Sequence, residues 1–230
     1  MERVVNVLEL PPGQRAVEGF PRFGVDTRRP PPRAPDGAVV ELTGPFARRV
    51  VLDGATLAGL PRREVEAAFH CVAGWSALGL RWEGVRVRDV WEQVVAPALV
   101  AEAEVRWLVL VGRDGYRSIV RLDDALADDV LLADRLDGAP LPPEHGAPLR
   151  LVSPGQYGYV NTKHLCRIEL HRREPVAFLH PARAVQWALM AVRPHPRARV
   201  AHEERHRFVP GPVARRLYRL VRLPAARLRE

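Results

Sequence analysis

The fold of this chain is decided by two short stretches, Phe69-His70-Cys71-Val72-Ala73-Gly74-Trp75-Ser76 and Tyr157-Gly158-Tyr159-Val160-Asn161-Thr162-Lys163-His164. In the first, a cysteine precedes a Gly-Trp-Ser turn, and its thiolate can bind a soft metal. In the second, a lysine follows a glycine-aromatic turn, where backbone N–H groups and a cation can hold a phosphate. We therefore expect one site that joins a thiolate to an anion-binding turn.

Strand and short-helix patterns alternate around these stretches without regular βαβ spacing. This predicts an α+β fold with mixed β-sheets and short helices. Tight hairpin turns are expected within 82–87 and at Asp114-Gly115-Tyr116. Strands are expected at 39–44, 48–52, 65–72, 106–112, 117–122, 130–133, 149–153 and 166–170, and helices at 87–95, 122–127, 160–165 and 185–192.

Three regions of the chain differ in composition. Residues 1–37 are predicted to form an extended N-terminal arm, because the prolines at 30–32 and 35 exclude a helix. Residues 38–171 are predicted to form the folded body. Residues 172–230 are rich in His, Pro and Arg and are expected to form a basic C-terminal arm with an amphipathic segment at 213–223. We expect this arm to pack on the body or on a second subunit; a membrane surface or membrane partner is the alternative contact.

Composition narrows the class of protein. The 230 residues are 47% hydrophobic, which supports a packed core. The net charge of +8 comes almost wholly from arginine, since Lys163 is the only lysine, and no zinc-finger or basic-heptad spacing predicts nucleic-acid binding. Two cysteines exclude a disulfide-rich scaffold. Neither an export signal nor a long apolar run is found, so we expect a cytoplasmic protein.

Five blocks of sequence occur in an order typical of one enzyme family. They are Cys71–Ser76, Trp82-Glu83-Gly84-Val85, Asp114-Gly115-Tyr116, the stretch from Gly138 to Arg150, and the lysine turn before Ile168-Glu169-Leu170. In this order they resemble the sulfite-oxidase-like molybdopterin oxidoreductases, whose bacterial branch includes reductases of oxidised methionine. The resemblance spans residues 39–170. It implies the sulfite-oxidase molybdopterin-binding fold, with 38–171 as the catalytic domain, and a molybdenum–molybdopterin cofactor.

The resemblance also implies roles for single residues. Cys71 matches the catalytic cysteine that ligates molybdenum. His145 and Arg150 match the pair that contacts the pterin and its phosphate, and a planar guanidinium suits bidentate phosphate binding. The turn that holds the phosphate matches Asn161, Thr162 and Lys163.

Three further residues are weaker candidates for cofactor contacts. Arg22 and Phe23 lie in a segment, Phe20-Pro21-Arg22-Phe23-Gly24, that is similar to the aromatic segment that closes over the pterin in bacterial members. Asp114 is a candidate for lining the same groove, although an Asp-Gly pair that simply forms a hairpin turn explains it equally well.

The chain departs from the family pattern at three positions. Many relatives carry a lysine where this chain has Val160 and a tryptophan where it has His164. Animal and plant sulfite oxidases place an arginine at the position of Ser76, so sulfite is a doubtful substrate.

The resemblance implies oxygen-atom transfer, as oxidation or reduction of a small oxo substrate such as a sulfur compound, with an unidentified electron-transfer partner. The alternative is a non-catalytic module of the same fold that binds molybdopterin or another anion. A zinc site built from His70, Cys71, His164 and Cys166 has suitable atoms but no known ligand spacing.

Overall fold

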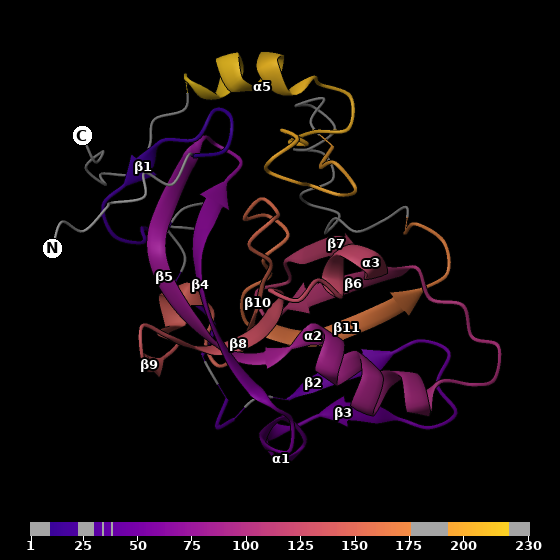
Figure 1. The fold of residues 1–230 in the computed structure, drawn as a ribbon. Coiled ribbons are helices and arrows are strands. Elements are labelled where there is room, and N and C mark those ends of the chain that lie inside the picture. The colour runs from indigo at the N-terminus through magenta and orange to yellow at the C-terminus, as the bar shows by residue number, and fades with distance from the viewer. Residues whose placement is uncertain (1–9, 23–29, 34, 38, 176–192, 221–230) are drawn as a thin grey trace, which may run out of the picture.

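The computed structural model describes residues 10–22, 30–33, 35–37, 39–175 and 193–220. Phe23, the helix expected at 185–192 and the part of the amphipathic segment after residue 220 lie outside these ranges. The α+β prediction with mixed sheets and short helices is confirmed, because the described residues form two mixed sheets and short helical segments (Figure 1).

The first sheet is built around the long hairpin that carries Cys71. Strands β4 (Arg62–Cys71) and β5 (Trp75–Arg86) pair antiparallel, with Cys71 opposite Trp75 at the turn. On its other edge β5 pairs antiparallel with β8 (Leu131–Leu136), and β1 (Ala16–Val17) joins its first residues in parallel. The sheet is completed on β8 by β9 (Ala139–Pro140) and β10 (Arg150–Val152).

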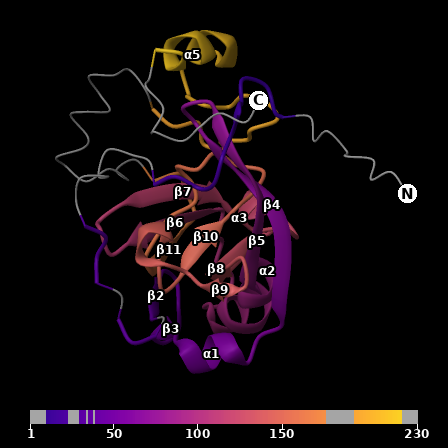
Figure 2. The same cartoon turned by 90° about the vertical axis from the view of Figure 1, so that its left-hand side faces the viewer.

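The second sheet has the strand order β3-β2-β11-β6-β7. Its central strand, β11, runs parallel to β2 and antiparallel to β6. The two sheets lie beside each other, and the β4–β5 hairpin extends beyond them toward α5 (Figures 1 and 2). The strand bounds are β2 (Val40–Thr43), β3 (Val50–Leu52), β6 (Trp107–Gly112), β7 (Arg117–Arg121) and β11 (Leu165–His171).

The helices are short. The expected helix at 87–95 is α2 (Val87–Val90), continued by a π-helical turn (Trp91–Val95) and a 3₁₀ turn (Ala96–Ala98). The other helices within the described residues are α1 (Gly54–Ala58), α3 (Leu122–Ala125), a 3₁₀ turn (Pro143–His145) and α5 (Gly211–Tyr218). No helix in the described part of the chain is long and apolar enough to cross a membrane.

Alternating side chains of the first sheet divide the core into two clusters. Leu132 of β8 points into the larger cluster, which it shares with the second sheet, α1 and α2. Its neighbours Leu131 and Ala133 point the other way, into a smaller cluster that contains Cys71 and Trp75. Successive strand residues face opposite sides of a sheet, so this alternation places Cys71 in the smaller cluster, apart from the larger one.

Two predicted elements are wrong. The hairpin expected within 82–87 is part of the continuous strand β5, and Gly84 serves a close approach of strands there, since a Cβ on it would lie 2.0 Å from the Leu132 carbonyl oxygen. The helix expected at 160–165 is a series of turns. Its backbone runs beside β10 instead, because Leu151 N donates to Thr162 O and Leu165 N donates to Leu149 O.

Candidate functional site

The turn after β4, which we call the cysteine loop (residues 71–75), has its backbone carbonyls satisfied from three directions. Cys71 O accepts from Gly74 N (3.0 Å) and from the Gln14 side chain (3.2 Å). Val72 O accepts from the Arg205 guanidinium. Gly74 O accepts from Arg15 N at 3.1 Å. The loop is therefore positioned by its own turn, by the N-terminal segment and by a residue more than a hundred positions later in the chain.

The Cys71 side chain is buried, with 7% of its surface exposed. Burial raises the pKa of this thiol to about 12, and the hydrogen bond from the Ala73 backbone and the positive charge of Arg205 oppose that rise. In the protein alone the group is therefore a protonated thiol. A metal that binds it must displace the proton, as thiolate coordination requires.

The second stretch lies directly against the first. Gly158 N donates to His70 O at 2.7 Å, and a Cβ on Gly158 would lie 2.2 Å from the tip of the Phe69 ring. Only a glycine allows this approach of backbone to ring. The structure thus brings together the two stretches that the sequence analysis pairs.

Arg150 is the most unusual charge in this region. It is completely buried, and its guanidinium lies 5.0 Å from the ring centroid of Trp82 and 5.7 Å from that of Phe69. Three of its five N–H groups donate to the carbonyls of His145 (2.9 Å), Asn161 (3.2 Å) and Leu151 (3.3 Å). None of the described carboxylates forms an ion pair with it. Burial lowers its pKa to about 9.

Arg150 belongs to a group of basic side chains that we call the basic cluster (Arg22, His145, Arg150 and Lys163). The pKa of Lys163 falls to about 7, first through burial and then through the charges of Arg150 and Arg22. Burial, Lys163 and Arg150 together lower the pKa of His145 to about 4. Neighbouring positive charges thus disfavour the charged forms of Lys163 and His145, and an anion among these side chains would oppose that effect.

Asn161 and Thr162 hold the turn rather than face a ligand. The Asn161 side chain accepts from Ser153 N (2.6 Å) and donates to Tyr157 O (3.3 Å), and the Thr162 hydroxyl pairs with Ser118 (2.6 Å). Their amides also have partners, Gly158 O and Val160 O. Of the predicted phosphate-binding turn, the Lys163 side chain therefore remains, with Nζ donating to Glu144 O at 2.8 Å.

The remaining candidate residues, Asp114 and Cys166, lie on or beside strands of the second sheet. Asp114 is exposed at the β6–β7 hairpin and accepts from Tyr116 N (2.9 Å), which is a turn contact, although its charge still acts on Lys163. Cys166 donates to Val111 O in the second sheet. Within the described ranges no three His, Cys, Asp or Glu side chains gather in a way that could hold a metal, and the zinc hypothesis therefore has no structural support.

Phe20 and Arg205 are site residues that the sequence analysis did not select. The Phe20 ring stacks on His145 (centroids 4.3 Å apart, 11° between planes) and covers the Arg150 guanidinium at 6.0 Å. Phe20 stands in the segment quoted for Arg22 and Phe23, so its aromatic character was the available signal. For Arg205 no signal existed, because one arginine among many carries no mark of burial.

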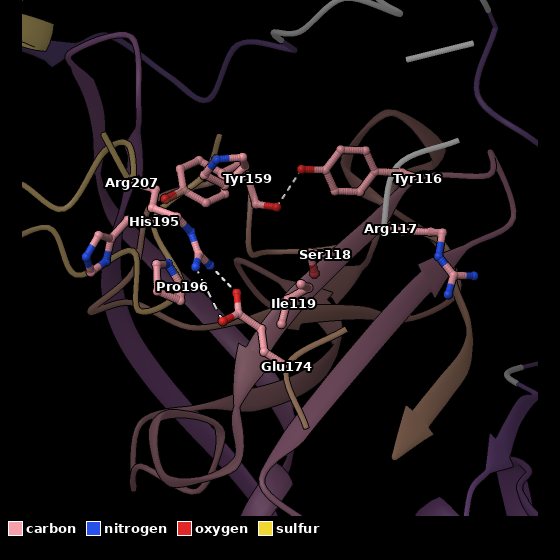
Figure 3. A pocket seen from close by; sticks show the side chains of 10 residues that line it. Tyr116, Arg117, Ser118, Ile119, Tyr159, Glu174, His195, Pro196 and Arg207 are labelled. Carbon is pink, nitrogen blue, oxygen red and sulfur yellow. Dashed lines mark hydrogen bonds and ion pairs between the residues drawn. The ribbon is translucent and has the colours of Figure 1, made fainter. Parts of the chain in front are cut away.

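A small cavity lies beside Tyr116, between β7 and the C-terminal segment (Figure 3). Its volume of about 30 Å³ suits one or two waters. In its wall, Tyr116 donates to Tyr159 O at 2.6 Å and Arg207 pairs with Glu174. The cavity joins the C-terminal segment to the sheet edge and is not part of the site at Cys71.

Residues 29–179 match the model of the family described as oxidoreductase molybdopterin binding domain. The chain belongs to this family. It is 40% identical over 118 residues to the uncharacterized oxidoreductase YuiH of Bacillus subtilis, covering 51% of this chain and 57% of that protein. It is 31% identical over 157 residues to the catalytic subunit MsrP of the protein-methionine-sulfoxide reductase of Xanthomonas campestris, covering 61% and 48%.

Among solved structures, this molybdopterin-binding domain is similar to the sulfane dehydrogenase SoxCD of Paracoccus pantotrophus, with a TM-score of 0.50 and 23% identity over 59% of this chain and 38% of that one. This likeness confirms the sulfite-oxidase fold. The chain spans about half the length of the curated relatives it matches.

The residues of the site fit the cofactor of this family. The basic cluster offers cations without a paired carboxylate at Arg150, and the buried Nδ1 of His145 has no hydrogen-bond partner in the described structure. Two N–H groups of Arg150 are left for an acceptor. The Phe20 ring lies over the same guanidinium at 6.0 Å. A phosphate is the kind of anion that such a donor set binds.

Proposed function

We propose that this chain transfers an oxygen atom to or from a small oxo substrate at a molybdenum centre, with Cys71 as the metal ligand. One observation carries the proposal: Phe69, two residues before Cys71, contacts Gly158 of the second stretch, and its ring lies 5.7 Å from the Arg150 guanidinium. When bound, the cofactor would supply a metal that exchanges an oxygen atom and two electrons with the substrate.

The chain's own residues have separate tasks in this proposal. Cys71 gives up its proton and donates its sulfur to the metal from a fixed loop. Arg150, Lys163 and His145 hold the pterin phosphate, and Phe69 and Trp82 exclude water from the Arg150 guanidinium. Exclusion of water strengthens each charged hydrogen bond in the site.

We propose a sulfur compound as the substrate, and oxidised methionine as its nearest example. The support is the similarity to a protein-methionine-sulfoxide reductase subunit. Ser76 agrees with a substrate other than sulfite, since its hydroxyl pairs with Gln14 (3.0 Å) and His70 (2.8 Å) and offers no cation. A cytoplasmic location stays a prediction.

Electrons require a partner protein, and we propose that it docks on the exposed face of α5. This helix and the turn after it expose the apolar side chains of Val213 (50% exposed), Leu217 (58%) and Leu220 (83%). Arg216 and Arg219 of the same segment form no ion pair with a described residue. Tyr218 of the same helix packs against the Cys71 cluster. The surface therefore suits an acidic electron-transfer protein.

Leu217→Ser with Leu220→Ser should slow turnover with such a partner and spare turnover with a small dye; equal loss with both contradicts the docking proposal.

Metal analysis of protein from a host that makes molybdopterin tests the reaction proposal. We expect near-stoichiometric molybdenum in the parent, and a Mo(V) paramagnetic signal that is altered or lost in Cys71→Ser. The matched control is Cys166→Ser, which removes a half-buried thiol bonded to Val111 O and should leave the signal unchanged. Stoichiometric molybdenum without turnover of any oxo substrate would favour the non-catalytic binding module, and a folded parent without molybdenum would contradict the proposal.

A further inference from the structure

Arg205 is a buried arginine that lies outside the residues matched by the family model, which end at 179. Its guanidinium donates to Val72 O in the cysteine loop and to Gly13 O (3.2 Å) and Pro12 O (3.4 Å) in the N-terminal segment. It also lies over the rings of Tyr157 (5.2 Å) and Tyr218 (5.8 Å). One side chain therefore contacts the cysteine loop, the N-terminal segment, the stretch 157–164 and α5.

The backbone around Arg205 is shaped to receive it. Gly13 has φ +71°, and a Cβ there would lie 2.7 Å from Arg205 Nη2. Gly74 has φ +91°, and a Cβ there would lie 2.9 Å from Gly13 O. Two glycines in the left-handed region thus leave room for the guanidinium between the loop and the N-terminal segment.

The charge balance shows that Arg205 is not held mainly by an acid. Its nearest carboxylate, Glu203, is 3.8 Å away and pairs more closely with Arg215. The carbonyls of the loop and the N-terminal segment are thus its main hydrogen-bond partners. The positive charge beside Cys71 also favours the ionised sulfur electrostatically.

We propose that Arg205 is a positioning residue of the cysteine site: it ties the cysteine loop to the N-terminal segment and so sets the place of the Cys71 sulfur. This inference rests on the proposed function and extends the site beyond the family domain to the C-terminal segment. A residue that orients a metal ligand from behind affects the metal without touching it.

Hydrogen exchange of the cofactor-free protein is the first test, read by mass spectrometry on peptides covering 69–77 and 165–171. In Arg205→Met we expect the amides of Gly74 and Ser76 to exchange about tenfold faster or more, because a charged hydrogen bond to the loop is lost, while β11 exchanges as in the parent. Arg205→Lys should restore part of the protection. Arg207→Met, two positions away and paired with Glu174 instead, is the control without effect.

A second pair of variants serves if Arg205→Met does not fold. Gly13→Ala directs a methyl group at the guanidinium, whereas Gly19→Ala has a similar φ (+67°) and nothing within 4 Å. We expect faster loop exchange in Gly13→Ala alone. Unchanged loop exchange in folded Arg205→Met, or in Gly13→Ala, would overturn the proposal.

The molybdenum-loaded protein tests whether the tie matters to the metal. We expect Arg205→Lys to keep its molybdenum but to shift the Mo(V) spectrum. If Arg205 only stabilised the loop, without setting the place of the Cys71 sulfur, the spectrum would stay unchanged. An unshifted spectrum would overturn the positioning role. A parent that binds no molybdenum would refute the proposed function and leave the exchange experiment to decide on Arg205 by itself.

Discussion

The cysteine loop and the basic cluster are adjacent, yet they are stabilised in opposite ways. Around the loop, the carbonyls of Cys71, Val72 and Gly74 have donors, and Arg205 is held by such carbonyls. In the basic cluster, burial lowers the pKa of Arg150, Lys163 and His145, and the charge of Arg150 lowers the pKa of Lys163 and His145 further. The loop is therefore complete before a cofactor arrives, whereas the cluster is energetically incomplete without an anion. The difference indicates that an anion bound in the basic cluster relieves electrostatic strain there. The cysteine loop, in contrast, already holds Cys71 rigidly as a metal ligand.

The largest effect is expected from Arg150→Met, which breaks the cluster at its most buried charge. Inorganic pyrophosphate should bind the cofactor-free variant about 10- to 100-fold more weakly, because a charged hydrogen bond contributes about 1.5–3 kcal/mol. Titration calorimetry gives the affinities. Arg167→Met is the control, since that side chain pairs with Glu169 on β11. Equal affinities of Arg150→Met and parent would remove Arg150 from the anion site.

The junction between the two regions is the second target. In Gly158→Ala the new Cβ would lie 2.2 Å from Phe69, so the ring must move, and we expect the free energy of unfolding to fall by about 1–3 kcal/mol. Gly155→Ala, three residues earlier with nothing within 4 Å, should change it by less than about 0.5 kcal/mol. Urea unfolding measures both. Similar stability of the two variants would mean that the contact is easily rearranged.

The third effect is a pH dependence, which is spread over several pH units and sharpens the contrast. The pKa of Lys163 is lowered from 10.5 to about 7, so above pH 7 the folded protein binds fewer protons at this residue than the unfolded chain does. Lys163 therefore makes stability rise with pH between about 7 and 10.5, by at most about 1.4 kcal/mol per pH unit.

Lys163→Met should remove this contribution. Urea unfolding between pH 6 and 8.5 checks it, in a range below the titration of Cys71. Identical slopes for parent and variant would show that Lys163 keeps an ordinary pKa and that the cluster is not strained.

Prediction from the sequence succeeded where local pattern and geometry coincide. The strand that ends at Cys71, the Asp114-Gly115-Tyr116 turn and the strand at 166–170 follow from alternation and turn residues, and all three are present. It was wrong at Gly84 and at 160–165, where glycine and turn residues serve contacts with β8 and β10. A strand pairing between distant segments has no local sequence signal.

The site shows the same division. His145, Arg150 and Lys163 were selected from motifs and act on one another in the structure, and Phe69 links the strand that ends at Cys71 to Arg150. Asn161 and Thr162 were selected with them, but the Asn161 side chain bonds to Tyr157 O and the Thr162 hydroxyl bonds to Ser118 on β7. Motif spacing identifies residues that recur at a site and does not separate those that face a ligand from those that shape the backbone.

The sequence by itself determined the family, the α+β class and the pairing of a cysteine turn with a lysine turn, because these depend on residue types at short spacing. Only the tertiary structure decided that Phe20 covers His145 and that Arg205 ties the cysteine loop to Gly13. Those contacts join segments as much as 192 positions apart. Burial and charge at such distances are properties of the packed chain, and no local stretch of residues encodes them.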